Sequence, residues 1–170
     1  MEDKVLESIA YILPATVTGL VAYYMFKGFI KNKSYEKKLE LLAQRKKESL
    51  PIKLQACERL LLFSDRINPV KMLMRIPPIS ADKKDYLNLL LANIAQEFAH
   101  NLVQQIYVSE NTWTAIFTAK NAVIKQLREV AEEATFADEM RENIFLVYTK
   151  TTPPTEIAIE FIKEEVRSLL

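Results

Sequence analysis

An uncharged run of eighteen residues, from Ile9 to Phe26, constrains this chain more than any other feature of its sequence. An α-helix rises about 1.5 Å per residue, so the run reaches about 27 Å. If Lys27 reaches back toward water, the helix extends through Ile30 to about 33 Å, and the hydrocarbon core of a bilayer is about 30 Å thick. The run therefore predicts a transmembrane helix, with residues 1–30 as the membrane anchor.

The predicted anchor combines apolar side chains with tyrosines near its ends, one proline and one glycine. Its characteristic residues are Ile9, Tyr11, Pro14, Gly19, Tyr23, Tyr24 and Phe26. Tyrosines at both ends are typical of membrane–water interfaces. Two other interpretations stay open, a cleaved signal peptide and a buried core helix. The acidic segment MEDKVLE disfavours the first, and the lack of a polar face disfavours the second.

Lysines crowd the C-terminal flank of the anchor. They are Lys27, Lys31, Lys33, Lys37 and Lys38. The N-terminal flank carries only Lys4, among three acidic residues. The positive-inside rule therefore predicts a single-pass protein of the inner membrane, with its N-terminus outside and its C-terminal domain in the cytoplasm. The flank is expected to contact anionic lipid headgroups, at about 1 kcal/mol per lysine. It lacks the interleaved exposed aromatics of a nucleic-acid surface, so we expect no nucleic-acid partner.

Charge is unevenly distributed along a chain whose formal net charge is only +1. The segment Lys27–Lys53 holds nine basic and three acidic residues, whereas Arg128–Leu170 holds five basic and ten acidic residues. This contrast predicts a basic juxtamembrane helix at residues 31–50, followed by a cytoplasmic helical domain at residues 51–170.

The soluble part of the chain has the periodicity of helices. Apolar residues recur every three or four positions, no stretch alternates with period two, and no Asn-Gly hairpin signal occurs. The predicted fold class is therefore all-α, with an N-terminal transmembrane helix followed by a cytoplasmic helical bundle.

Capping residues and prolines suggest where the helices begin and end. Pro51 is expected to end one helix or to start the next. Asn68 is expected to cap a short helix that a Pro-Pro pair ends. The longest helix is expected to run from a cap at Ser80 or Asp82 to about Val108.

The remaining caps are expected closer to the C-terminus. Ser109 or Asn111 should cap the next helix, and the TFAD segment at Thr135–Asp138 the one after it. Thr152 should cap the last helix, with Pro153 in its first turn.

Several chemistries are poorly supported by the residues present. No glycine follows Gly28, which excludes a Gly-rich phosphate loop beyond it. His100 is the only histidine and Cys57 the only cysteine, so a site with several such ligands cannot form within one chain. Glu97 and His100 match the Glu-x-x-His of di-iron bundles, which require two such motifs and two more carboxylates. We expect no catalytic residue, cofactor, metal or small-molecule substrate.

The leading functional hypothesis is a non-enzymatic, membrane-tethered scaffold or docking domain for an unidentified cytoplasmic protein. Its candidate interaction surface consists of His100, Asn101, Gln104, Gln105 and Tyr107. One alternative is a self-assembling membrane protein, a homo-oligomer that pairs through Ala15 and Gly19 and through Tyr35, Leu39 and Leu42. A second alternative is a metal- or ligand-binding bundle that uses Glu97 and His100.

Three segments resemble a known family when taken in this order. They are LPIKLQACERLLLFSDRINP (Leu50–Pro69), QEFAHNLVQQIYVSENTWTAI (Gln96–Ile116) and AIEFIKEEVRSLL (Ala158–Leu170). They resemble an uncharacterised family of short single-pass proteins from Gram-negative bacteria, and His100–Ser109 is the most specific part. The resemblance implies an anchored helical architecture and no particular activity, substrate or catalytic residue.

Overall fold

The computed structural model describes residues 2–170, with the backbone alone for residues 2–13, 15, 32 and 34. The described chain is helical and contains no strand, which confirms the predicted all-α class. It divides into two compact units, which we call the N-terminal unit (Met1–Ser49) and the bundle (Leu50–Leu170).

Helix α1 runs from Glu2 to Arg66, so Pro51 neither ends nor begins a helix. The prediction of a boundary there was wrong because an exposed proline removes only one backbone hydrogen bond, and a long helix tolerates this loss. Next to it, the hydroxyl of Ser49 donates to the carbonyl of Lys46 at 3.1 Å. At Pro14, the hydroxyl of Thr18 donates to the proline carbonyl at 2.7 Å.

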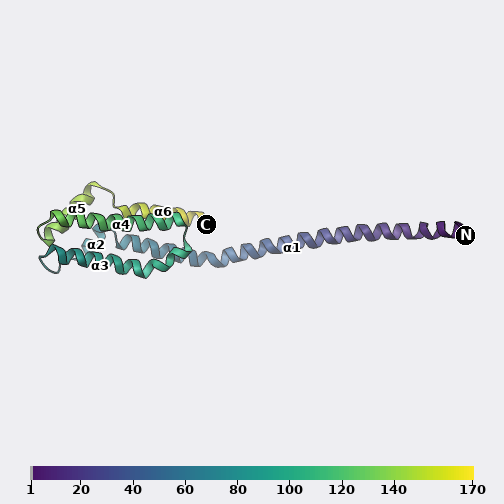
Figure 1. Ribbon diagram of the computed structural model, residues 1–170, viewed down its shortest axis with the longest axis horizontal. Coiled ribbons are helices and arrows are strands. Elements are labelled where there is room, and N and C mark those ends of the chain that lie inside the picture. The colour runs from purple at the N-terminus through teal and green to yellow at the C-terminus, as the bar shows by residue number, and fades with distance from the viewer. Residues whose placement is uncertain (1) are drawn as a thin grey trace. The chain divides into compact units, whose positions relative to one another are not determined.

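The bundle contains the end of α1 and the helices that follow it. These are α2 (Pro69–Arg75), α3 (Lys83–Asn101), the short 3-10 helix η1 (Leu102–Tyr107), α4 (Glu110–Glu133), α5 (Ala137–Lys150) and α6 (Pro154–Leu169). Helix α4 is the central element, because it packs against α3, α5 and α6. Figure 1 shows α3, α4 and α6 running side by side within the bundle.

One face of each helix supplies the core of the bundle. From α1 come Cys57, Leu60 and Phe63; from α3 come Tyr86, Leu90 and Ile94; from α4 come Ile116, Ala119, Val123 and Leu127; and from α5 and α6 come Met140, Ile144, Ala158 and Ile162. Each set repeats at three or four residues, so the periodicity of the sequence correctly indicated which helices carry a buried face.

Helix α3 is shorter than predicted. It ends at Asn101, whose side-chain Nδ2 donates to the carbonyl of Glu97 at 2.8 Å, and η1 follows. A side chain that bonds the carbonyl four residues back competes with continued helix. Leu102 and Ile106, which the predicted helix would have included, lie on η1 and are exposed, and α4 is longer than α3.

The predicted caps were right at some helices and wrong at others. Asn68, Asp82 and Ser109 cap α2, α3 and α4 through their side chains. The last helix begins at Pro154, with Pro153 rather than Thr152 at the cap position and without a side-chain cap. Two successive prolines fix this start because each presets the helical φ and lacks an N–H.

Candidate functional site

A pocket of about 340 Å³ lies between α1 and α3 of the bundle, and we call it the α1–α3 pocket. One wall is made by residues at positions i, i+3, i+4 and i+7 of α1, namely Arg59, Leu62, Phe63 and Arg66. The other wall is the C-terminal end of α3, with Glu97, His100 and Asn101. Two arginines and a histidine against a single carboxylate give the pocket a basic character.

An ion pair crosses the pocket from one helix to the other. Nη1 of Arg66 lies 2.8 Å from Oε1 of Glu97, whose side chain is only 14% exposed. A largely buried carboxylate requires such a partner, because an unpaired charge away from water is costly. The pair therefore neutralises Glu97 and holds the guanidinium of Arg66 at the pocket.

A third arginine supports the backbone of this wall. Nη2 of Arg75 donates to the carbonyl of Arg66 at 3.3 Å and to Oδ1 of Asn93 at 3.0 Å. The other two basic side chains of the pocket are uncommitted: within the described chain, no hydrogen bond or ion pair engages the side chain of Arg59 or of His100.

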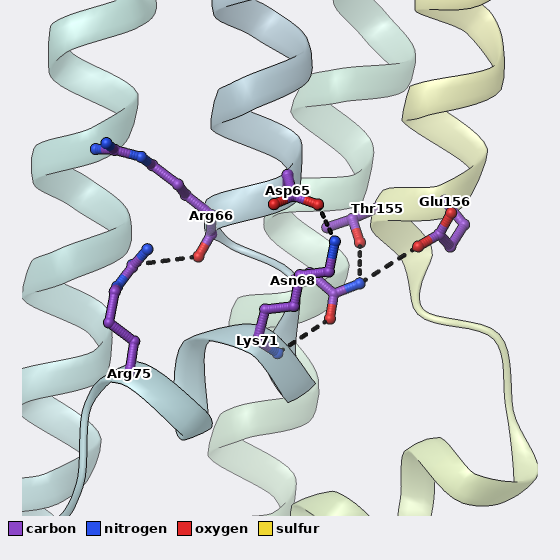
Figure 2. A network of polar contacts seen from close by, with 7 residues as sticks. All are labelled: Asp65, Arg66, Asn68, Lys71, Arg75, Thr155 and Glu156. Atoms are coloured by element: carbon purple, nitrogen blue, oxygen red, sulfur yellow. Dashed lines mark hydrogen bonds and ion pairs between the residues drawn. The ribbon is translucent and has the colours of Figure 1, made fainter.

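A buried asparagine fixes the corner where α1 meets α2, as Figure 2 shows. The Oδ1 atom of Asn68 accepts a hydrogen bond from the N–H of Lys71 at 3.4 Å. Its Nδ2 donates to Oγ1 of Thr155 at 3.2 Å and to Oε1 of Glu156 at 3.5 Å. Asn68 and Thr155 are almost fully buried, so this polar contact lies inside the bundle.

An ion pair between Lys71 and Asp65 closes the same corner from the outside. Its hydrogen bond raises the pKa of Lys71 above the usual value for lysine. Arg66 is the next residue after Asp65, and in Figure 2 its side chain extends away from Asn68. The corner therefore fixes the end of α1 from which Arg66 reaches the α1–α3 pocket.

The family to which the chain belongs is decided by its match over nearly its whole length. The model described as Family of unknown function (DUF7935) matches residues 3–169. The chain belongs to this family. No curated protein and no solved structure matches it. The prediction of an uncharacterised family is confirmed, and a membrane anchor and a Gram-negative origin stay predictions.

In this DUF7935 chain, Glu97 and His100 share a pocket, but the carboxylate faces a guanidinium rather than a second carboxylate. Across the residues whose side chains are described, no three histidine, cysteine, aspartate or glutamate residues gather in a way that would hold a metal ion. The Glu-x-x-His spacing is thus used, on the Glu97 side, for an ion pair between helices.

The five residues of the predicted interaction surface do not all lie together at the pocket. His100 and Asn101 line it, whereas Gln104, Gln105 and Tyr107 lie on η1 and are not among its lining residues. Among these five, the structure brings only the first two together with the basic residues of α1.

Sequence reasoning missed Arg59, Arg66 and Arg75. The first two carried a signal, because they stand seven residues apart and border the apolar stripe of the same helix. Arg75 carried none, since its partner Asn93 lies on a different helix and comes near only in the folded bundle.

The predicted membrane-anchor residues lie partly outside the described side chains. Ile9 and Tyr11 fall there, and nothing is described of their side chains. Those that are described, Pro14, Gly19, Tyr23, Tyr24 and Phe26, are exposed. Within the part of the chain that the structure describes, no helix combines the length and the apolarity needed to cross a membrane.

The predicted lipid-contacting lysines, Lys27, Lys31, Lys33, Lys37 and Lys38, are all exposed on α1. Two of them lie over aromatic rings one turn away. Nζ of Lys27 is 5.8 Å from the ring centroid of Tyr23, and Nζ of Lys33 is 5.4 Å from that of Phe29. Both side chains thus cover apolar surface with their methylene stems.

A carboxylate from α6 closes the first turn of α4. Glu165 accepts hydrogen bonds from the N–H of Ser109 at 3.2 Å, from Oγ1 of Thr112 at 2.7 Å and from the Ser109 hydroxyl. Burial acts to raise the pKa of Glu165, but these hydrogen bonds outweigh it and hold the pKa below its usual value. Nearby Cys57 is buried, and burial followed by the charge of Glu165 raises the pKa of its thiol. This thiol is therefore poorly suited to act as a nucleophile.

A second hollow, of about 550 Å³, lies between α4 and α6. Its walls include Ala115 and Ala122 of α4 and the exposed apolar side chains Ile157 and Phe161 of α6. We call it the α4–α6 groove. Small side chains on one helix and large ones on the other give the groove a predominantly apolar lining.

Proposed function

We propose that the chain is a membrane-anchored helical docking domain of the inner membrane, in which the N-terminal unit binds the bilayer and the bundle receives a cytoplasmic protein. One observation carries the proposal. Every large apolar side chain described from residue 17 to residue 30 is between 51% and 70% exposed: Val17, Leu20, Val21, Tyr23, Tyr24, Met25, Phe26, Phe29 and Ile30.

Such a run requires a cover, because monomeric soluble proteins rarely expose contiguous apolar surface of this extent. Lipid is the cover favoured by the residues at its end. Lys27 and Lys33 place ammonium groups beside aromatic rings where the apolar run ends, as lysines do at a membrane interface. The lysine excess on this flank favours a cytoplasmic location for the bundle.

The bundle supports a docking role by the shape of its surface. The α4–α6 groove presents Ile157 at 62% and Phe161 at 39% exposure on a helix whose opposite face is packed in the core. A groove between packed helices with apolar side chains on its wall is the kind of surface that receives a helix of another protein.

Membrane attachment is tested on the full chain expressed in a Gram-negative host. The protein is expected in the membrane pellet after an alkaline carbonate wash, and protease should digest the bundle only in inverted vesicles. Recovery of the chain in the wash supernatant would contradict the anchor. Digestion from the periplasmic side would contradict the orientation.

Docking is tested by crosslinking in membranes, followed by detergent solubilisation and capture of the tagged chain. A crosslinked partner should be lost in Ile157→Glu with Phe161→Glu and retained in Leu146→Glu, a matched change at an exposed leucine of α5. Equal recovery from both variants would remove the α4–α6 groove as the docking surface.

Self-assembly is a second proposal, favoured by a different surface. Tyr35, Leu39 and Leu42 are 65%, 49% and 52% exposed and share one face of α1, so a second copy of this helix would cover them. A dimer or larger oligomer in mild detergent, lost in Leu39→Glu with Leu42→Glu, is expected. A monomeric mass for the unmodified chain would exclude it.

A further inference from the structure

We propose that the α1–α3 pocket binds a phosphate monoester group, with Arg59, Arg66 and His100 as its hydrogen-bond donors. The inference does not rest on membrane anchoring or on a protein partner, because every residue in it belongs to the bundle.

The charges in the pocket favour an anion. Glu97 is the single acidic residue of the lining, and its charge is matched by Arg66 at 2.8 Å. The guanidinium of Arg59 remains as an unmatched positive charge, and His100 lines the opposite wall of the same pocket. An anion that enters the pocket therefore meets a net positive surface.

The donors come from two helices, which suits a group with several acceptor oxygens. Arg59 and Arg66 are seven residues apart on α1, about 10 Å along its axis, and His100 comes from α3. Guanidinium groups bind phosphate and carboxylate oxygens in pairs, in the plane of the guanidinium. Donors on two facing helices match the several directions in which the oxygens of a phosphate accept.

The arginine side of the pocket is organised before any ligand arrives. Glu97 holds the guanidinium of Arg66, and Arg75 holds the Arg66 carbonyl. The Asn68 corner in Figure 2 fixes the end of α1 that carries both contacts. Arg66 and the backbone that carries it therefore need little further ordering when a ligand binds, and the ordering cost falls on the side chains of Arg59 and His100.

The rest of the lining indicates an ester rather than the free ion. The lining includes the half-exposed side chain of Leu62 and the buried ring of Phe63. A volume of about 340 Å³ exceeds that of a phosphate and lies within the size range of small-molecule sites. The organic part of a monoester would lie against Leu62. Such a group comes either from a soluble phosphate monoester or from a lipid with a phosphomonoester headgroup.

The test uses the purified full chain in a neutral detergent and in nanodiscs. Calorimetric titration with phenyl phosphate and with inorganic phosphate probes the soluble source. Nanodiscs of phosphatidylcholine with and without phosphatidic acid probe the lipid source, through protection of the bundle from protease. Arg59→Gln is the main variant, because Arg59 has no partner within the protein to lose.

Binding is expected to weaken roughly tenfold or more in Arg59→Gln, because a charge-assisted hydrogen bond is removed. Arg128→Gln, a matched change at an exposed arginine of α4 that does not line the α1–α3 pocket, should leave binding unchanged. Arg66→Gln removes the ion-pair partner of Glu97. Its binding data are interpreted only if its thermal unfolding matches that of the wild type. His100→Gln serves as a second independent variant.

The two arms separate the sources. An Arg59-dependent response to phenyl phosphate supports the site with a soluble ligand. A response confined to nanodiscs with phosphatidic acid, and lost in Arg59→Gln, supports it with a lipid headgroup. The proposal is overturned by no response in either arm, by equal weakening in Arg128→Gln, or by unchanged binding in both Arg59→Gln and His100→Gln.

Discussion

Phe26 and Phe63 are the same residue type on the same helix, yet one is 69% exposed and the other 1% exposed. The difference comes from their neighbours in the sequence. Around Phe26 apolar residues occur on all sides of the helix, whereas around Phe63 they return every three or four positions. The side chains of a one-sided apolar stripe pack against other helices of the same chain, whereas those of the all-round apolar run stay exposed in it.

The largest expected effect comes from making the apolar run around Leu20 and Val21 polar, which tests whether lipid covers it. Leu20→Arg combined with Val21→Arg is expected to abolish membrane association, because each arginine costs about 2.5–3.5 kcal/mol at the centre of a membrane helix. The fraction of protein left in the carbonate-washed pellet measures it. Leu41→Arg with Leu42→Arg, beyond the apolar run, is the control. A pellet unchanged by the first pair would show that lipid does not cover these residues.

The second prediction compares leucines in the two units. Leu60→Ala should destabilise the bundle by about 2–5 kcal/mol, since a fully buried side chain leaves a cavity. Leu41→Ala, at a half-exposed leucine of the N-terminal unit, should change the stability by less than about 0.5 kcal/mol. Urea unfolding followed by the fluorescence of Trp113, the only tryptophan, reports on the bundle. Equal effects would contradict the difference in burial.

The third prediction concerns the hydrogen bonds of the buried Asn68 side chain in the bundle. Asn68→Ala removes the cap of α2 and leaves buried Thr155 without the amide, at an expected cost of about 1–2 kcal/mol. The same urea titration measures it. Asn88→Ala, at an exposed position of α3, should be close to neutral. A neutral Asn68→Ala would show that the corner in Figure 2 is not needed for stability.

The smallest expected effect is at Glu165. Its pKa in the folded protein lies below the usual 4.5, so its carboxylate stabilises the bundle above that pH. This contribution is lost as the pH falls from 4.5 through the folded pKa. Glu165→Gln should cost about 1 kcal/mol at pH 7, and its difference from the wild type should shrink in acid. Glu164→Gln, at an exposed position of the same helix, is the control. A difference that is independent of pH would contradict the assigned hydrogen bonds.

Much of the fold could be predicted because it depends on residues near one another in the sequence. The buried faces follow from spacing, and Asn68, Asp82 and Ser109 cap helices whose first N–H groups lie two or three residues away. The early end of α3 was harder to predict, because an asparagine can also lie inside a helix. The sequence does not show that the side-chain amide of Asn101 donates to the Glu97 carbonyl. The passage of α1 through Pro51 was missed because proline is usually a boundary.

The α1–α3 pocket could be predicted only in part. His100 and Asn101 were predicted as members of an interaction surface, but the pocket depends on contacts across 31 residues between Arg66 and Glu97. Local spacing carries no information about which face of α1 meets which face of α3. The basic character of the pocket therefore appears only once the helices are packed.

The buried amide of Asn68 has a consequence for how the chain leaves the ribosome. Its Oδ1 accepts a hydrogen bond from Lys71, three residues later in the sequence. Its Nδ2 donates to Thr155, which is synthesised only 87 residues later. A nascent or truncated chain without α6 has all the other helices of the bundle and still leaves this donor without its partner. The sixteen-residue helix α6 thus completes the polar contacts of the bundle, and a chain that ends before Thr155 lacks the acceptor for this amide.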